Sequence, residues 1–240
     1  MSGKSGLDRN VRFGVVGATA HFQVGFDSSG DSPVAYGGHS AETINYVSCH
    51  DDLSLVDKLR ASAPEGMTEE ELVRFDKLAQ TVVLTAQGIP SLFAGEEMLR
   101  TKGGVSNSHD SPDRVNRIDW SFKADHKDVF DYYRGLIALR RTHPAFRLAT
   151  AAEIERHLRF LDTGDTHVVA YRLVDHAGGD PWREILVVYN GARAEKRVRI
   201  PPGDWHAVCL DGRIASEALA VFSGDSVPVP ASSALIAYLP

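Results

Sequence analysis

The sequence predicts an α/β part over residues 1–149 and an all-β part over residues 150–240. Between residues 42 and 142, apolar strand-like runs alternate with amphipathic helical runs, and polar residues follow each strand. Beyond residue 150, short strand-like runs follow one another without helices. The first pattern is typical of part of an α/β barrel or of a doubly wound sheet, and the second of an antiparallel β-sandwich.

Length and composition fit an ordinary globular protein. The 240 residues are 43% hydrophobic and 24% charged, enough for one large domain or two smaller ones. A net charge of -6 disfavours a nucleic-acid partner, and no run approaches the length of a membrane helix. Residues 1–10 lack the apolar core of a secretory signal, so we expect a cytoplasmic protein. Cys49 and Cys209 are far apart in the sequence, and we expect two buried free thiols.

The α/β part divides into two strands and two helices. Residues 44–49 are apolar on both faces, which predicts a parallel strand covered by helices. Thr68 and Glu71 form a capping box that begins a helix over residues 68–87. Residues 89–95 form a second short strand, and residues 125–142 a second helix that Pro144 closes. Before these elements, glycines interrupt the apolar residues 11–26, and residues 27–42 read as a polar loop.

The all-β part contains five strand candidates separated by turn residues. They cover residues 166–173, 184–190, 196–200, 205–210 and 233–240. The sequence Pro-Pro-Gly-Asp at residues 201–204 predicts a turn between the third and fourth.

Polar residues at the strand tips are the candidate site. His50, Asp51 and Asp52 follow the first strand; a carboxylate there can stabilise a cationic transition state, and an imidazole can hydrogen-bond a hydroxyl group. The alternative is a strand-end turn with solvated acids. Glu96 and Glu97 follow the second strand; they could form part of the site, but we expect them to support it at the strand end.

The long polar loop over residues 101–120 is a second candidate. Its possible contacts to a hydroxyl-rich ligand are Asn107, His109, Asp110 and Asp113. The alternative is a polar surface loop in which residues 111–113 serve only as a turn. The histidines lack metal-ligand spacing and no phosphate-binding loop is present, so we expect no metal and no cofactor.

Four segments resemble consecutive parts of type I pullulanase, the debranching enzyme of the alpha-amylase superfamily. They are TINYVSCHDDLSLVDKL, AQGIPSLFAGEEMLRTKGG, NSHDSPDRVNRIDW and YYRGLIALRRTHPAFRL, and their order and spacing match over residues 42–148. The resemblance implies the carboxyl-terminal part of a (β/α)8 barrel followed by a β-sandwich. Residues 44–49 and 89–94 would be barrel strands seven and eight, and the two helices would be the last two barrel helices. The family hydrolyses α-1,6 glucosidic bonds in pullulan and branched glucans with retention.

The same resemblance assigns roles at the site. Asp51 matches the family's third invariant acid, which stabilises the oxocarbenium-like transition state, and His50 matches a histidine that binds the same sugar. The nucleophile and the acid/base lie before the matched region, so we expect the isolated chain to be inactive. The chain departs from the family at Asp52, where asparagine is usual, at His109 and Asp110, and at Phe93. The alternative function is a non-catalytic carbohydrate-binding or assembly module that self-associates through the uncovered faces of an incomplete barrel.

Overall fold

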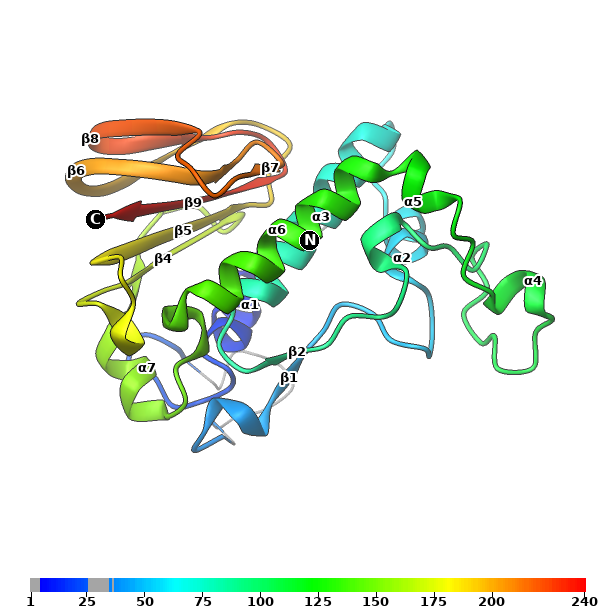
Figure 1. The fold of residues 1–240 in the computed structure, drawn as a ribbon, viewed down its shortest axis with the longest axis horizontal. Helices are drawn as coiled ribbons and strands as arrows, with labels where there is room; N and C mark the ends of the chain where they lie inside the picture. The colour runs from blue at the N-terminus through cyan, green and yellow to red at the C-terminus, as the bar shows by residue number, and fades with distance from the viewer. Residues whose placement is uncertain (1–4, 26–34, 36) are drawn as a thin grey trace.

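The computed structural model describes residues 5–25, 35 and 37–240 (Figure 1). Residues 1–4 and the larger part of the loop expected at 27–42 lie outside the described residues. The α-helices are α1 (Asp8–Val15), α2 (Leu55–Ala61), α3 (Glu69–Thr85), α4 (Asp113–Asn116), α5 (Phe122–Asp125), α6 (Lys127–Thr142) and α7 (Ala151–His157). Short 3₁₀ helices are η1 (Ser40–Glu42), η2 (Glu96–Met98), η3 (Pro144–Arg147) and η4 (Ala177–Gly179). The strands are β1 (Ile44–Asn45), β2 (Ile89–Pro90), β3 (Leu158–Leu161), β4 (Val168–Leu173), β5 (Glu184–Asn190), β6 (Lys196–Leu210), β7 (Arg213–Ile214), β8 (Ala220–Val229) and β9 (Ser233–Leu239).

The two long predicted helices, α3 and α6, are confirmed and lie side by side (Figure 1). Thr68 caps α3 as expected: its backbone N–H donates to the Glu71 carboxylate at 3.0 Å, and Glu71 N donates to Thr68 Oγ1 at 3.2 Å. The facing sides of the helices bury Phe75 and Leu78 of α3 and Leu136 of α6. Apolar packing therefore holds this pair together.

The strands β1 and β2 pair in parallel, as expected, but each is only two residues long. Beyond Asn45 the chain finds side-chain partners instead of a neighbouring strand: Lys58 Nζ donates to Val47 O at 3.3 Å. The predicted burial of this strand on both faces is wrong, because Ile44 is 61% exposed and Tyr46 is 56% exposed. Among the described residues, Ile89 of β2 is also exposed, so this strand pair is open to solvent.

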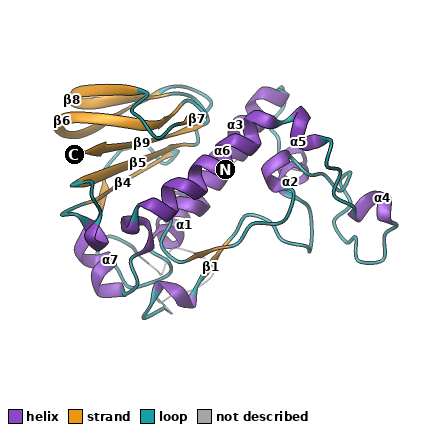
Figure 2. Ribbon diagram, in the orientation of Figure 1, coloured by secondary structure: helices purple, strands orange, loops and turns teal. Residues whose placement is uncertain are grey.

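The remaining strands form one antiparallel sheet in the order β3-β4-β5-β9-β6-β7, with β8 paired to β6 (Figure 2). Alternate residues of β5 point to opposite faces of the sheet. Ile185 and Val187 belong to a core shared with α3 and α6, whereas Leu186 and Val188 belong to a second core shared with Trp205 of β6 and with β8. The sheet therefore folds over itself into two layers, and the helices cover its outer face.

The expected turn at residues 201–204 is wrong. The runs 196–200 and 205–210 belong to one strand, β6, whose pairing with β8 shifts register between Arg199 and Gly203. Pro201 and Pro202 have no N–H to give to the ladder, so the strand bulges there and continues.

The first helix, α1, lies in a region where glycines obscured the pattern. It ends in Val15, which is fully buried, and the Val15 carbonyl accepts a 2.9 Å hydrogen bond from Gln87 N. The two cysteines are free, as expected; Cys209 is buried, but Cys49 is half-buried and lies in the loop beyond β1. Among the described helices, none combines the length and the apolar character needed to cross a membrane.

Candidate functional site

His50 and Asp51 lie in the loop that follows β1. His50 Nε2 is 3.5 Å from Asp51 Oδ2, and the two side chains are 84% and 76% exposed. The donor atoms of Cys49, His50 and Asp51 lie within 4.8 Å of one another. These three residues are consecutive, and His50 and Asp51 are open to solvent, so their proximity follows from chain connectivity and does not indicate a built metal site. The Asp51 carboxylate is freely accessible to a ligand.

Asp52 adopts a left-handed backbone conformation, with φ of 56°. This region is unfavourable for most residues, but asparagine and aspartate tolerate it because their short polar side chains hydrogen-bond locally. The backbone at this position explains why the residue after Asp51 belongs to this small set. It also turns the chain sharply just before α2.

Asp57, on the first turn of α2, connects this loop to the long polar loop. Its carboxylate accepts hydrogen bonds from Ser54 Oγ at 2.8 Å, from Lys102 N at 2.7 Å and from the Thr101 hydroxyl. Burial raises the pKa of Asp57, but the hydrogen bonds from Thr101, Lys102 and Ser54 outweigh it and hold the pKa below its ordinary value. Asp57 is therefore a buried, ionised anchor for both loops.

Lys102 completes the connection. Its side chain is almost fully buried, and its ammonium group donates to the backbone carbonyl of His50 at 3.1 Å. The segment that carries His50 and Asp51 is thus fixed directly to the start of the loop that carries the other predicted residues.

The predicted residues of the long loop are exposed and interact with one another. His109 Nδ1 lies 3.0 Å from Asn107 Oδ1 and 4.0 Å from Asp110 Oδ1. Asp113 is exposed and begins α4. The loop is shaped from inside by Asn116, whose Nδ2 donates to Ser108 O at 2.6 Å and to Ser111 O at 3.2 Å. Two exposed clusters result, His50 with Asp51 and Asn107 with His109 and Asp110, and the members of each are near neighbours in the sequence.

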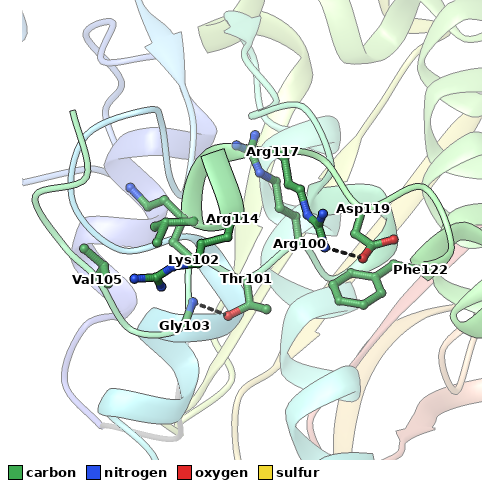
Figure 3. Close-up of a pocket in the computed structure, with 10 residues that line it drawn as sticks. Arg100, Thr101, Lys102, Gly103, Val105, Arg114, Arg117, Asp119 and Phe122 are labelled. Atoms are coloured by element: carbon green, nitrogen blue, oxygen red, sulfur yellow. Dashed lines mark hydrogen bonds and ion pairs between the residues drawn. The ribbon is translucent and has the colours of Figure 1, made fainter. Parts of the chain in front are cut away.

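The base of the long loop encloses a pocket of about 340 Å³ (Figure 3). Its lining includes four cationic residues and one acid; the cations are Arg100, Lys102, Arg114 and Arg117, and the acid is Asp119. Figure 3 shows Arg117 directed at Asp119, 3.7 Å away, and Thr101 accepting from Gly103 N at 2.9 Å. The predicted site residues do not line this pocket.

Two buried acids lie beneath the strand ends. Burial raises the pKa of Glu96 to about 7, against hydrogen bonds from Ser48, Phe93 and Gln80 that lower it. Burial also raises the pKa of Asp76 to about 8; the Tyr133 hydroxyl lowers it, and the negative charge of Glu96 raises it further. Glu96 is thus placed where the sequence predicts a supporting acid, and Asp76 was not anticipated.

Sequence reasoning also missed Asp57 and Lys102. Asp57 had a recognisable signal, because Ser54-Leu55-Val56-Asp57 has the spacing of a helix-capping motif just after the candidate site. Lys102 had none, since its burial depends on how two loops meet.

Comparison with known proteins identifies similar sequences and structures. The family model described as "Pullulanase, all-beta domain" matches residues 154–213. The pullulanase of Bacillus subtilis (strain 168) is 40% identical over 161 residues, which are 67% of this chain and 22% of that protein. The apo pullulanase of Paenibacillus barengoltzii superposes with a TM-score of 0.85 at 41% identity, over 100% of this chain and 35% of that one.

The Paenibacillus barengoltzii enzyme has also been solved in complex with maltohexaose and alpha-cyclodextrin, and this chain matches that structure at 40% identity with a TM-score of 0.83. The chain spans about a fifth to a third of the length of these relatives. On the matching domain model, the sequence identity and the superposition along its whole length, this chain belongs to the pullulanase family.

Proposed function

We propose that this chain is the carboxyl-terminal part of a glucan-debranching hydrolase that cleaves α-1,6 glucosidic bonds in pullulan and branched glucans with retention. Asp51 stabilises the positively charged transition state, and His50 binds the same sugar. Asn107, His109, Asp110 and Asp113 contribute substrate contacts from the long loop. The observation that carries this proposal is the Asp57–Lys102 connection, which fixes the His50–Asp51 segment to the base of that loop.

The fold supports an assignment to the end of a barrel. The parallel pair β1 and β2 is linked by α3, which is the crossover arrangement from which (β/α)8 barrels are built. We propose that β1 and β2 belong to barrel strands seven and eight, with α3 and α6 as the last two barrel helices. The barrel part then covers residues 1–149 and the β-sandwich residues 150–240. The cytoplasmic location remains a prediction from the sequence.

The isolated chain should bind oligosaccharide without hydrolysing it. Retaining hydrolysis needs a nucleophile and an acid/base about 5 Å apart, and the family resemblance puts both outside the matched segments. A reducing-sugar assay of the purified chain on pullulan should show no turnover. Clear turnover would contradict this part of the proposal.

Binding is tested by calorimetric titration with maltotriose, the ligand of choice because related enzymes are co-crystallised with it. Asp51→Ala should weaken binding about tenfold, a loss of ~1.4 kcal/mol. Asp225→Ala is the matched control, because Asp225 is an exposed acid on β8. Equal affinity of the Asp51 variant and the wild-type chain would overturn the role of Asp51.

A second candidate, assembly, is favoured by one surface. A groove of about 350 Å³ is lined by apolar residues of α1, β1 and α3, among them Val11, Val82, Val83 and the exposed Ile44 and Tyr46. In the described part of the chain, β1 pairs with β2 alone and leaves an open strand edge. A second copy of this chain would cover both the groove and the edge.

Light scattering after size exclusion distinguishes the two candidates. If the chain self-associates here, Ile44→Lys should produce monomers, whereas Val221→Lys should not, because Val221 is a similarly exposed apolar residue on β8. A monomeric wild-type chain would contradict the assembly proposal and leave sugar binding unaffected.

A further inference from the structure

Glu96 joins three segments that are distant in the sequence. Its side chain is 2% exposed and accepts hydrogen bonds from the Ser48 hydroxyl, from Gln80 Nε2 at 2.8 Å and from Phe93 N at 3.3 Å. Ser48 follows β1 and precedes His50 by two residues, Gln80 belongs to α3, and Phe93 follows β2. One buried carboxyl group therefore binds the carboxyl ends of both short strands to the helix that connects them.

The partner of Glu96 on α3 is itself held by a second buried acid. Asp76 stands one turn before Gln80, is 1% exposed, and accepts the Tyr133 hydroxyl on Oδ1 at 2.7 Å. Among the described residues, Asp76 Oδ2 and Gln80 Oε1 are both buried without a hydrogen-bond partner. Asp76 and Gln80 are four residues apart on α3, the spacing of neighbours on one helix face. Two acceptor oxygens cannot bond to each other, but a proton on Asp76 Oδ2 would let it donate to Gln80 Oε1.

We infer that Glu96 is a positioning residue that fixes the segment carrying His50 and Asp51 to α3, and that a protonated Asp76 orients Gln80 toward it. The significance for sugar binding rests on the proposed function; the connection itself does not. The chain runs Tyr133–Asp76–Gln80–Glu96–Ser48, from the interface between α3 and α6 to the candidate site.

The connection depends on pH, because its acids share one buried region. Within the described residues, three acidic groups surround Glu96: Asp76 of α3, Tyr133 of α6 and Glu97, the next residue in the chain. In addition to burial, the negative charge of Glu96 raises the pKa of Asp76 and of Tyr133, and the charge of Glu97 raises the pKa of Glu96. The nearest cation on α3, Lys77, is engaged elsewhere, with Asp128 at 3.0 Å and Gly212 O at 3.2 Å. Loss of the Asp76 proton, near the pKa of about 8, would remove this donor, so Gln80 would no longer be held in its orientation toward Glu96.

Backbone ¹⁵N order parameters of residues 46–51 test the connection. Ser48→Ala should lower them from about 0.85 to below about 0.6 and leave β5 unchanged. Ser223→Ala is the matched control, since Ser223 of β8 donates at 2.6 Å to an exposed acid, Asp204 of β6. Order parameters of the Ser48 variant equal to those of the wild type would overturn the inference, as would an equal loss in β5.

Two conservative variants separate positioning from bulk structure. In Glu96→Gln the amide oxygen can accept from Gln80 and Phe93 while the amide nitrogen donates to Ser48, so the order parameters should stay at the wild-type value. In Asp76→Asn the amide nitrogen can donate to Gln80 permanently, so the loosening of residues 46–51 above about pH 8 should disappear. Persistence of that loosening in Asp76→Asn would refute the role of the Asp76 proton.

Titration with maltotriose keeps the two proposals apart. Weaker binding by Ser48→Ala together with lowered order parameters supports both. If the wild-type chain binds no maltotriose but Ser48→Ala still lowers the order parameters, the sugar site is overturned and the positioning role of Glu96 stands.

Discussion

The ammonium group of Lys102 donates to the carbonyl oxygen of His50 across 3.1 Å, although the two residues are 52 positions apart in the sequence. The backbone N–H of the same Lys102 donates to the Asp57 carboxylate. The position of the candidate site therefore depends on one buried acid and one buried base. Each can be changed without touching a predicted sugar-binding side chain.

Lys102→Met should separate binding from stability. A buried ammonium that has a carbonyl partner is costly to desolvate, so an apolar side chain of similar length should change the free energy of unfolding by less than about 1 kcal/mol. Maltotriose affinity should fall several-fold, because His50 loses its tether. Lys127→Met is the control, since Lys127 lies on the exposed side of α6 and pairs with Asp131. Calorimetry and urea unfolding measure the two effects.

Asp57→Ala should destabilise the fold strongly. The substitution leaves the donors at Ser54, Thr101 and Lys102 unpaired in a buried place, which we expect to cost about 2–3 kcal/mol. The pKa of Asp57 is lower in the folded protein than in the unfolded chain. Its contribution to the free energy of unfolding is therefore present above the unfolded pKa of about 4, and it is lost as the pH falls through the folded pKa. Urea unfolding of both proteins at neutral and acidic pH checks this; a difference that persists unchanged in acid would contradict it.

Asp52→Gly should stabilise the protein modestly, and Asp52→Ala should destabilise it. A left-handed φ of 56° lowers the free energy of unfolding by about 1 kcal/mol for a residue that has a Cβ. Alanine also lacks the polar side chain by which aspartate offsets part of this cost. Asp52→Asn should be close to neutral. Thermal melting of the three variants ranks them, and an alanine variant as stable as the glycine variant would argue against backbone strain at this position.

Asp76→Asn should flatten the pH dependence of stability. The pKa of Asp76 is about 8 in the folded protein, whereas its ordinary value is 3.8. Between these two pH values the folded state keeps a proton that the unfolded chain has released. The stabilisation is complete below about pH 4 and declines as the pH rises through 8. Wild-type stability should therefore fall over that window by more than that of Asp76→Asn. Urea midpoints at about pH 5 and about pH 9 test this, with Asp225→Asn as the control that keeps the wild-type slope.

Local chemistry explains which elements could be predicted. The Thr68–Glu71 capping box and the apolar spacing of α3 depend on residues close in sequence, and both are confirmed. The strand β5 has the expected limits because a run apolar on both faces admits few other arrangements. The residues Pro-Pro-Gly-Asp favour a turn, but pairing with β8 keeps them within one strand. This long-range pairing could not be predicted from the residues themselves.

The candidate site was predictable mainly in its exposed parts. His50 and Asp51 were identified by their place at a strand tip and by family resemblance, and the structure places them in the loop just beyond the short strand β1. Among the residues that support them, Glu96 was expected, whereas Lys102 and Asp76 were not, because their roles depend on burial. Burial of a charged residue depends on long-range packing, for which a single sequence carries no periodic signal.

Phe75 of α3 and Ile185 of β5 belong to one apolar core, which joins the helical part to the sheet. Tyr171 reinforces this junction by donating from its hydroxyl to Thr85 O at 2.9 Å. Moving the helices against the sheet would separate these buried contacts, so we expect α3, α6 and the sheet to move as one unit.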